Sequence, residues 1–223
     1  IYVIMYFGAI LYLSASTIVT AREYQNRSRL LIYPLILFVM AETIIQVALP
    51  ELHVTWLCVT LLSVLYFIYC NEMWNQLDAL TGLLNQNSYL KRTGGGRCNE
   101  GVLVVFDVDN FKQINDHYGH VQGDVCLAEI AECIKKVYAN DGYCYRIGGD
   151  EFCVLLKNSE KEGECRQEFL WRMEEKRRKI PFLPTVSYGS ASFSGEDIVE
   201  VKERADRDMY QYKNRRKNCS STE

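Results

Sequence analysis

The segment YCYRIGGDEFCVLL (residues 143–156) contains two short apolar runs on either side of a Gly-Gly pair. Each run has the length of a strand, and Gly148 followed by Gly149 favours a tight type I′ hairpin turn. Glycine also permits positive φ and lets a ligand approach the backbone without a Cβ in the way. We therefore predict a β-hairpin whose second strand opens with Asp150 and Glu151.

The residues around this hairpin alternate between strand-like runs and helical spacing. GVLVVFD (101–107) is typical of a buried strand, and apolar residues at helical spacing predict a helix over 123–139. After the hairpin we predict a charged helix over about 160–179, a strand over 185–193 and a final helix over about 196–216. The order βαββαβ plus a helix predicts an α+β domain of the ferredoxin-like, split-βαβ type with a mostly antiparallel sheet.

This topology brings acidic residues together. The first and third strands are antiparallel neighbours at the centre of such a sheet, so the end of one meets the start of the other. Asp107 and Asp109 close the first strand, and Asp150 and Glu151 open the third. Such a cluster of oxygen ligands suits Mg²⁺, which leaves positions for phosphate oxygens. An exposed acidic hairpin turn is the alternative for the last two residues.

The N-terminal third differs in composition, and we expect it to cross a membrane three times. Residues 1–21 carry no charged side chain, 30–50 are apolar apart from Glu42, and about 53–70 are apolar. Each segment is long enough for a transmembrane helix, which needs about 20 residues. Because the chain begins with Ile1 rather than Met, we expect residues 1–70 to be the C-terminal part of a larger membrane sensor region.

The loops of this region predict its orientation. The connection between the first two segments is rich in arginine, whereas Pro50 to His53 has no Lys or Arg, so the first connection should be cytoplasmic (Arg22, Arg27 and Arg29). Two further crossings then place everything after Cys70 in the cytoplasm. We expect a multi-pass protein of the cell (inner) membrane, with 71–77 as a short linker to a cytoplasmic domain.

Composition excludes several other classes. The net charge of −3 gives no basic footprint for nucleic acid, and the basic run KNRRK (213–217) is too short to supply one. The nine cysteines form no CxxC pair, so neither a zinc site nor a disulfide framework is indicated. We expect a reducing compartment and no nucleic-acid partner.

Four blocks in register resemble the signature motifs of GGDEF domains: DALTGLLN (78–85), FDVDNFKQINDHYGHVQGD (106–124), RIGGDEF (146–152) and ADRDMYQYKNRRKN (205–218). The resemblance covers residues 78–218 and leaves 219–223 as a tail. It implies a palm-type GGDEF catalytic domain, a diguanylate cyclase that condenses two GTP into cyclic di-GMP and two pyrophosphates. One such domain supplies half a catalytic site, so a homodimer is also implied.

The resemblance implies a metal-dependent reaction where the two central strands meet. Asp107, the backbone carbonyl of Val108 and Asp150 would hold one or two Mg²⁺ or Mn²⁺ ions. Asp150, or a water that it orients, would accept the proton of the attacking 3′-hydroxyl. Glu151 would support the site as the next carboxylate.

For the triphosphate, the resemblance implies contacts from the turn after the first strand and from the last helix. Phe111 and Lys112 lie in that turn, whose backbone N–H groups would cradle phosphate. Lys213 matches the family's lysine, whereas Lys217 stands where an arginine is usual, with Arg216 replacing the usual glycine. A lysine keeps the charge but loses the bidentate fork. A solvated basic helix end is the alternative for these lysines.

For the base, the resemblance implies that Asn115 and Asp124 recognise guanine. A carboxylate accepts from N1–H and the exocyclic amine, while a side-chain amide pairs with O6 or N3. His120 would be a further substrate contact, and Gly148 and Gly149 would let the nucleotide approach the hairpin backbone. The alternatives are a turn former for Asn115, a helix N-cap for Asp124 and a loop-ordering residue for His120.

Two departures from the family pattern carry expectations. Gln86 and Asn87 replace the usual Arg-Arg, and a short helix followed by TGGGR (93–97) predicts an abbreviated first helix. The RxxD motif of product inhibition would place its Arg at Ala139 and its Asp at Gly142, so we expect no feedback inhibition of that type.

Two other functions remain open. A catalytically inactive GGDEF module would bind GTP or cyclic di-GMP as a signalling element, although degenerate family members usually lose the acidic motif, which is whole here. A class III-like cyclase or a polymerase palm would share the fold. The guanine-reading pair and the closing helix argue against that third possibility.

Overall fold

The computed structural model describes residues 55–94 and 100–220, together with isolated helical positions at 37, 41, 44, 45 and 48. The chain divides into two compact units, Ile1–Asn75 and Gln76–Glu223. In the first unit α3 (Thr55–Trp74) continues into the segment expected to be a linker. The expected spans at 1–21 and, apart from the isolated positions, 30–50 lie outside the described residues. Within the described part of the chain, we find no helix with both the length and the apolar composition needed to traverse a bilayer.

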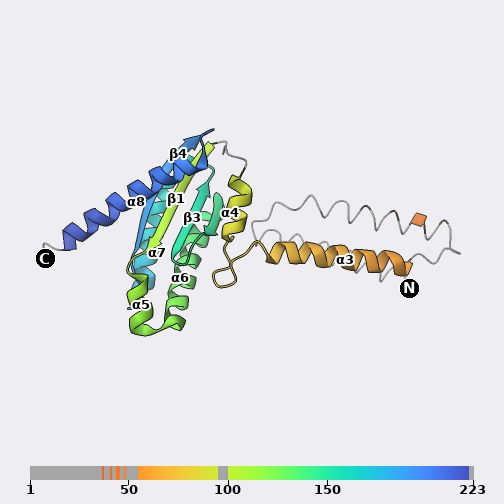
Figure 1. Cartoon of the computed structure of the whole chain (residues 1–223), viewed down its shortest axis with the longest axis horizontal. Helices are drawn as coiled ribbons and strands as arrows, with labels where there is room; N and C mark the ends of the chain where they lie inside the picture. Colours follow the sequence, from red (N-terminus) through yellow and green to blue (C-terminus); the bar gives the residue numbers. More distant parts are fainter. Residues whose placement is uncertain are drawn as a thin grey trace. The chain divides into compact units, whose positions relative to one another are not determined.

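The second unit is built on a four-stranded sheet with the order β2-β3-β1-β4. Every neighbouring pair of strands is antiparallel, which confirms the predicted ferredoxin-like arrangement (Figure 1). The elements are α4 (Gln86–Thr93), β1 (Glu100–Val108), α5 (Phe111–Tyr118), α6 (His120–Tyr138), β2 (Gly142–Arg146), β3 (Glu151–Leu156), the 3₁₀ turn η2 (Ser159–Lys161), α7 (Glu162–Lys179), β4 (Val186–Ser194) and α8 (Ile198–Ser220).

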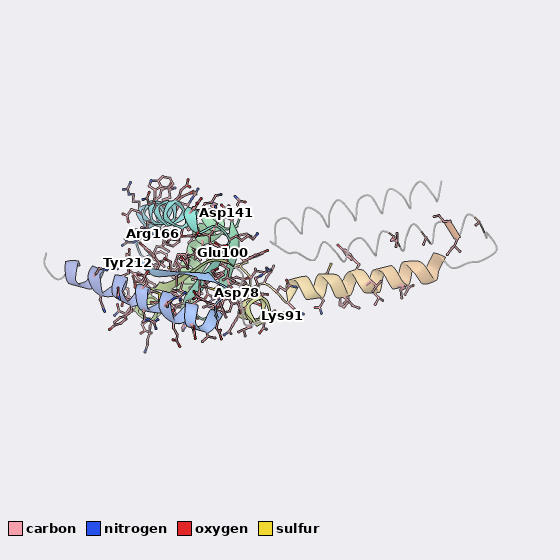
Figure 2. All side chains as sticks on the ribbon, turned by 90° about the horizontal axis from the view of Figure 1, so that it is seen from above. Asp78, Lys91, Glu100, Asp141, Arg166 and Tyr212 are labelled. Atoms are coloured by element: carbon pink, nitrogen blue, oxygen red, sulfur yellow. The ribbon has the colours of Figure 1, made fainter. Side chains whose placement is uncertain are left out.

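The sheet is covered on both faces because the central strand β1 is apolar and buried from Val102 to Phe106. Alternate residues of a strand point to opposite faces. Val104 and Phe106 of β1 join the core formed with α6 and α7, whereas Leu103 and Val105 join the core formed with α4 and α8. Figure 2 shows α7, which carries Arg166, and α8 on opposite sides of the sheet.

Both outer strands have their edges occupied. Along β2, the backbone N–H of Leu84 donates to the carbonyl of Cys144 over 3.0 Å. Along β4, Asp208 of α8 accepts from the backbone N–H of Ser190 over 3.0 Å, and Arg204 donates to a β4 carbonyl. Polar groups of an edge strand that would otherwise be open to another chain are thereby satisfied within the domain.

Gly189 sets the position of α8 on the sheet. A Cβ built at Gly189 would lie 2.2 Å from the carbonyl oxygen of Ala205 and 2.2 Å from the backbone nitrogen of Met209. No side chain larger than hydrogen fits between β4 and α8 at this point. The close approach fixes the helix one turn before Lys213, and Figure 1 shows the last turns of α8 projecting beyond the sheet.

One helix was not predicted. Residues 111–118 form α5, and α6 begins at His120 rather than at residue 123. The two helices are separated only by Gly119, whose φ of 86° breaks the helical path. The segment 111–118 is only eight residues long, and none of its side chains is fully buried, although Phe111 and Ile114 pack against the core.

Candidate active site

The ends of β1 and β3 meet as predicted. Asp107 and Glu151 are cross-strand partners, and the backbone N–H of Val108 donates to the carbonyl of Asp150 over 3.2 Å. The carboxylate of Asp150 is half-buried and makes no hydrogen bond or ion pair with any described residue, and Glu151 is exposed. The fold therefore brings two acidic segments of the sequence to one end of the sheet.

The donors expected to hold a metal ion agree with a hard divalent cation. Among the residues that the structure describes, no group of three His, Cys, Asp or Glu side chains is spaced to hold an ion. The expected set has only two carboxylates, Asp107 and Asp150, with the carbonyl of Val108. All three donors are oxygens, and Mg²⁺ commonly binds through one or two carboxylates while keeping waters or phosphate oxygens.

Lys213 lies at this end of the sheet and contacts two acids. Its Nζ donates to Oδ2 of Asp107 and lies 3.5 Å from Oδ1 of Asp109. Asp109 is itself fixed, because its two oxygens accept hydrogen bonds of 2.7 Å from the hydroxyls of Thr185 and Ser187. Burial opposes the charge of Lys213, but the hydrogen bond to Asp107 and the two carboxylate charges raise its pKa above the usual value. Lys213 is a cation at neutral pH.

The hairpin loop differs from the predicted turn. Neither Gly148 nor Gly149 has a positive φ, so the expectation of a type I′ turn was wrong. The N–H groups of Ile147 and Gly148 both donate to the carbonyl of Glu151, over 3.0 and 3.3 Å, which closes a wider loop. A Cβ at Gly148 would lie 3.2 Å from that of Glu151, whereas nothing lies within 4 Å of a Cβ at Gly149. The backbone at Gly149 is therefore open to a ligand.

A partly buried ion pair holds this loop, and sequence reasoning did not assign it. Arg146 donates to both oxygens of Asp78, over 3.0 and 3.3 Å, and to the carbonyl of Gly149 over 2.7 Å. Burial opposes the charge of Asp78, but hydrogen bonds from Thr81 and Arg146 lower its pKa. Asp78 opens the motif DALTGLLN and Arg146 opens the motif RIGGDEF. The presence of opposite charges in two motifs of one family is the sequence feature from which this pair could have been predicted.

The N-terminus of α5 supplies the N–H groups that were expected from a turn. Asn110 adopts a left-handed conformation, with φ 56°, and its carbonyl accepts from the N–H of Gln113 over 2.9 Å. The N–H groups of Phe111 and Lys112 come before the first intrahelical bonds and point out of the helix end, where an anion is favoured. Lys112 is exposed.

The last basic position is only partly described. Lys217 lies within α8, but its side chain is outside the described part of the structure. Its role as the replacement for an arginine therefore stays a prediction.

Asn115 has a buried polar atom without a partner. Its Oδ1 makes no hydrogen bond with any described residue, and a Cβ at Gly123 would lie 1.9 Å from this atom. The amide of α5 therefore packs against α6 directly beside Asp124, whose side chain is exposed. An unsatisfied buried polar group costs about 1–3 kcal/mol. Such a cost is offset when a ligand supplies the missing hydrogen bond.

Two of the alternatives for these residues are wrong. Asn115 lies inside α5 rather than in a turn, and α6 is preceded by Gly119, so Asp124 is not its N-cap. His120 is the first residue of α6 and is exposed. Figure 1 shows α5 and the start of α6 together at one end of the sheet.

Fold and site together define a domain of the GGDEF type. The family model described as diguanylate cyclase, GGDEF domain, matches residues 75–219. The chain belongs to the GGDEF family.

Curated relatives and solved structures are similar over the same region. Diguanylate cyclase A of Treponema denticola is 32% identical over 143 residues, which cover 61% of this chain and 38% of that protein. Diguanylate cyclase DgcS of Shewanella oneidensis is 34% identical over 156 residues, covering 66% of this chain and 53% of that protein. The chain thus spans about half or less of the length of these relatives. The crystal structure of the GGDEF domain of DgcB from Caulobacter crescentus, in complex with c-di-GMP, has a TM-score of 0.53 at 29% identity and covers 62% of this chain and 90% of that chain.

Proposed function

We propose that this chain is a diguanylate cyclase, which joins two GTP molecules into cyclic di-GMP and releases two pyrophosphates. The observation that supports the proposal is the contact of Lys213 with Asp107 at the end of β1, where the backbone of Val108 bonds to that of Asp150, in a chain of the GGDEF family. This end of the sheet offers carboxylates for a metal ion and a lysine for phosphate. The relatives named diguanylate cyclases match the same region.

For each new phosphodiester bond, the attacking 3′-hydroxyl loses one proton and the attacked GTP loses one pyrophosphate. Asp150 accepts the proton of the 3′-hydroxyl, and the hydroxyl oxygen then bonds to the α-phosphorus of the second GTP as the bond to pyrophosphate breaks. Asp107, Asp150 and the carbonyl of Val108 would hold Mg²⁺ or Mn²⁺, which when bound neutralises charge on the reacting phosphate. Glu151 supports this acidic end.

The rest of the nucleotide is held on both sides of that point. The N–H groups at the start of α5 and the charges of Lys112, Lys213 and Lys217 orient the triphosphate, and Gly149 leaves room beside the hairpin. Asn115 and Asp124 bind guanine, with His120 as a further contact. Holding the phosphate in line with the hydroxyl contributes to the rate by orientation alone.

Two chains are needed because each domain brings one GTP. We propose a two-fold homodimer in which the nucleotides face each other. We also propose that residues 1–70 attach the protein to the cell (inner) membrane, with the catalytic domain in the cytoplasm. The membrane region would act as a sensor that controls the geometry of the dimer. The apolar composition of 1–21 and 30–50 and the arginines between them support this topology.

The proposed activity is tested by incubating the purified full chain with GTP and Mg²⁺ and searching for cyclic di-GMP. Product should form, with a rate that rises more steeply than linearly at low protein concentration because two chains are required. Absence of product at high protein concentration would contradict the proposal. Binding of GTP or cyclic di-GMP without turnover would instead identify an inactive signalling module.

Replacement of Asp124 by alanine should weaken GTP binding and reduce discrimination against ATP by roughly ten- to a hundredfold, since hydrogen bonds to a charged group contribute about 1.5–3 kcal/mol. Asn115→Ala should act in the same direction without loss of stability, because it removes a polar atom that has no partner among the described residues. Calorimetry with non-hydrolysable GTP and ATP analogues measures both affinities. Asp116→Ala, a neighbouring exposed carboxylate, is the matched control. Unchanged selectivity in both test variants would exclude this guanine site.

Added cyclic di-GMP at micromolar concentration should leave the initial rate unchanged. The two positions of the inhibitory motif are Ala139 and Gly142, and a Cβ at Gly142 would lie 2.7 Å from the carbonyl oxygen of Leu155, so the strand excludes a carboxylate there. Asp141 is already paired with Lys161 over 2.7 Å. Initial rates against added product, with calorimetry of product binding, check the expectation.

An Asp141→Ala, Lys136→Ala double variant serves as the control for a shifted inhibitory site. Micromolar inhibition of the unmodified chain would contradict the prediction. If that inhibition persisted in the double variant, the feedback site would lie elsewhere on the chain.

A further inference from the structure

The acidic end of the sheet carries its own cation. The side chains of Lys213, Asp107 and Asp109 are 30%, 21% and 13% exposed, so water screens their charges only in part. Attraction between partly buried charges is stronger than between exposed ones. The attraction between Lys213 and Asp107 is therefore stronger than that of an ion pair exposed on the surface.

The protein holds this lysine in place from two sides. Asp109 accepts hydrogen bonds from Thr185 and Ser187 of the neighbouring segment, which orient its carboxylate toward Lys213. One turn earlier, α8 rests on Gly189. A side chain fixed in this way loses little further entropy when it pairs with Asp107.

The two carboxylates assigned to the metal therefore differ. Asp107 is neutralised by an internal ammonium group, whereas Asp150 has no hydrogen-bond or ion-pair partner among the described residues. A divalent cation would bind the same carboxylate of Asp107 whose Oδ2 accepts a hydrogen bond from the ammonium group. Two cations at one carboxylate repel each other, so they compete.

We propose that Lys213 is an internal counter-ion that occupies Asp107 when no nucleotide is bound, so that a divalent cation and Lys213 exclude each other there. The inference rests on the proposed function for its assignment of Asp107 as a metal ligand. A triphosphate gives Lys213 an alternative anionic partner and frees Asp107. Metal and nucleotide thus bind with positive coupling, each raising the affinity for the other by the same factor.

The test measures Mn²⁺ binding to the purified full chain, by calorimetry and without nucleotide. Lys213→Met removes the charge and keeps the length of the side chain. Mn²⁺ should bind this variant about tenfold more tightly than the unmodified chain, the order expected when one partly buried competing ion pair is removed. Asp109→Asn, which loosens Lys213 without removing it, should give a smaller increase of the same sign.

Two controls separate direct competition from a general effect of charge. Lys112→Met removes an exposed lysine that makes no ion pair with the described residues, and it should change Mn²⁺ affinity by less than about twofold, because solvent screens its charge. Adding Asp107→Asn to Lys213→Met should abolish the gain. Thermal unfolding of each variant confirms that it is folded.

Coupling provides a second measurement. Mn²⁺ affinity should rise on addition of a non-hydrolysable GTP analogue, and this rise should shrink in Lys213→Met. Equal Mn²⁺ affinity in Lys213→Met and the unmodified chain, or no binding to either, would overturn the inference. A third outcome is that Lys213→Met binds Mn²⁺ more tightly while the unmodified chain forms no cyclic di-GMP. That result would contradict the proposed function but support the competition between Lys213 and the cation at Asp107.

Discussion

Replacement of Asp150 by alanine is expected to lower the rate of cyclic di-GMP formation by roughly 10³-fold or more, because general base catalysis alone contributes about 10²–10⁴-fold and a metal ligand is lost with it. The fold should be unaffected. The Asp150 carboxylate makes no hydrogen bond or ion pair with any described residue, and only its backbone carbonyl joins the sheet. Steady-state rates with GTP, together with thermal unfolding, separate the two effects.

A matched control removes a carboxylate elsewhere in the domain. Glu203 is exposed on α8 and forms only a long ion pair of 3.8 Å with Arg207, so Glu203→Ala should keep full activity. Asp107→Ala should match the loss seen for Asp150→Ala. Near-normal turnover in Asp150→Ala would show that the metal ligands and the base have been assigned to the wrong carboxylate.

Gly189→Ala is expected to destabilise the domain by about 1–3 kcal/mol or more, the usual cost of inserting an atom into a packed interior. The new Cβ would meet backbone atoms of Ala205 and Met209 at 2.2 Å, and backbone cannot rotate away as a side chain can. The helix must shift, and Lys213 shifts with it. We therefore expect a lower urea midpoint and a higher KM for GTP in the same variant.

The control for this prediction is Gly163→Ala in α7, where nothing lies within 4 Å of the added Cβ. Alanine favours a helix over glycine by up to about 1 kcal/mol, so this variant should be as stable as the unmodified chain or slightly more so. Unchanged stability and KM in Gly189→Ala would mean that α8 can move off β4 at no cost. Its position would then not be set by this glycine.

The strands and the hairpin follow from sequence because their apolar runs have the length of a strand and are bounded by glycine or acidic residues. Topology then predicts that the acidic end of the first strand meets the acidic start of the third, and the register pairs Asp107 with Glu151 there. The contact of Lys213 with Asp107 could not be predicted in the same way. The two residues are 106 positions apart, and their meeting depends on how closely α8 approaches β4 at a glycine.

The predictions of the helix and the turn nearest the site were wrong for a different reason. The segment 111–118 is a helix of only eight residues, in which Phe111 and Ile114 pack against the core without being fully buried, so its apolar pattern is too short to predict a helix by itself. Gly148 and Gly149 suggested a mirror-image turn, but two N–H groups converge on one carbonyl and close a wider loop. At the hairpin, hydrogen bonding therefore outweighed the pattern of residue types.

The occupied edges of the sheet restrict how this domain associates with copies of itself. Leu84 blocks strand addition beside β2, and Asp208 and Arg204 block it beside β4. Joining two sheets into one continuous ladder would require several of these bonds to break first. A second copy of the domain would therefore have to meet it through loops or helices rather than through an edge of the sheet. The same arrangement protects the domain from templated aggregation at high local concentration, as expected when many copies crowd a small area.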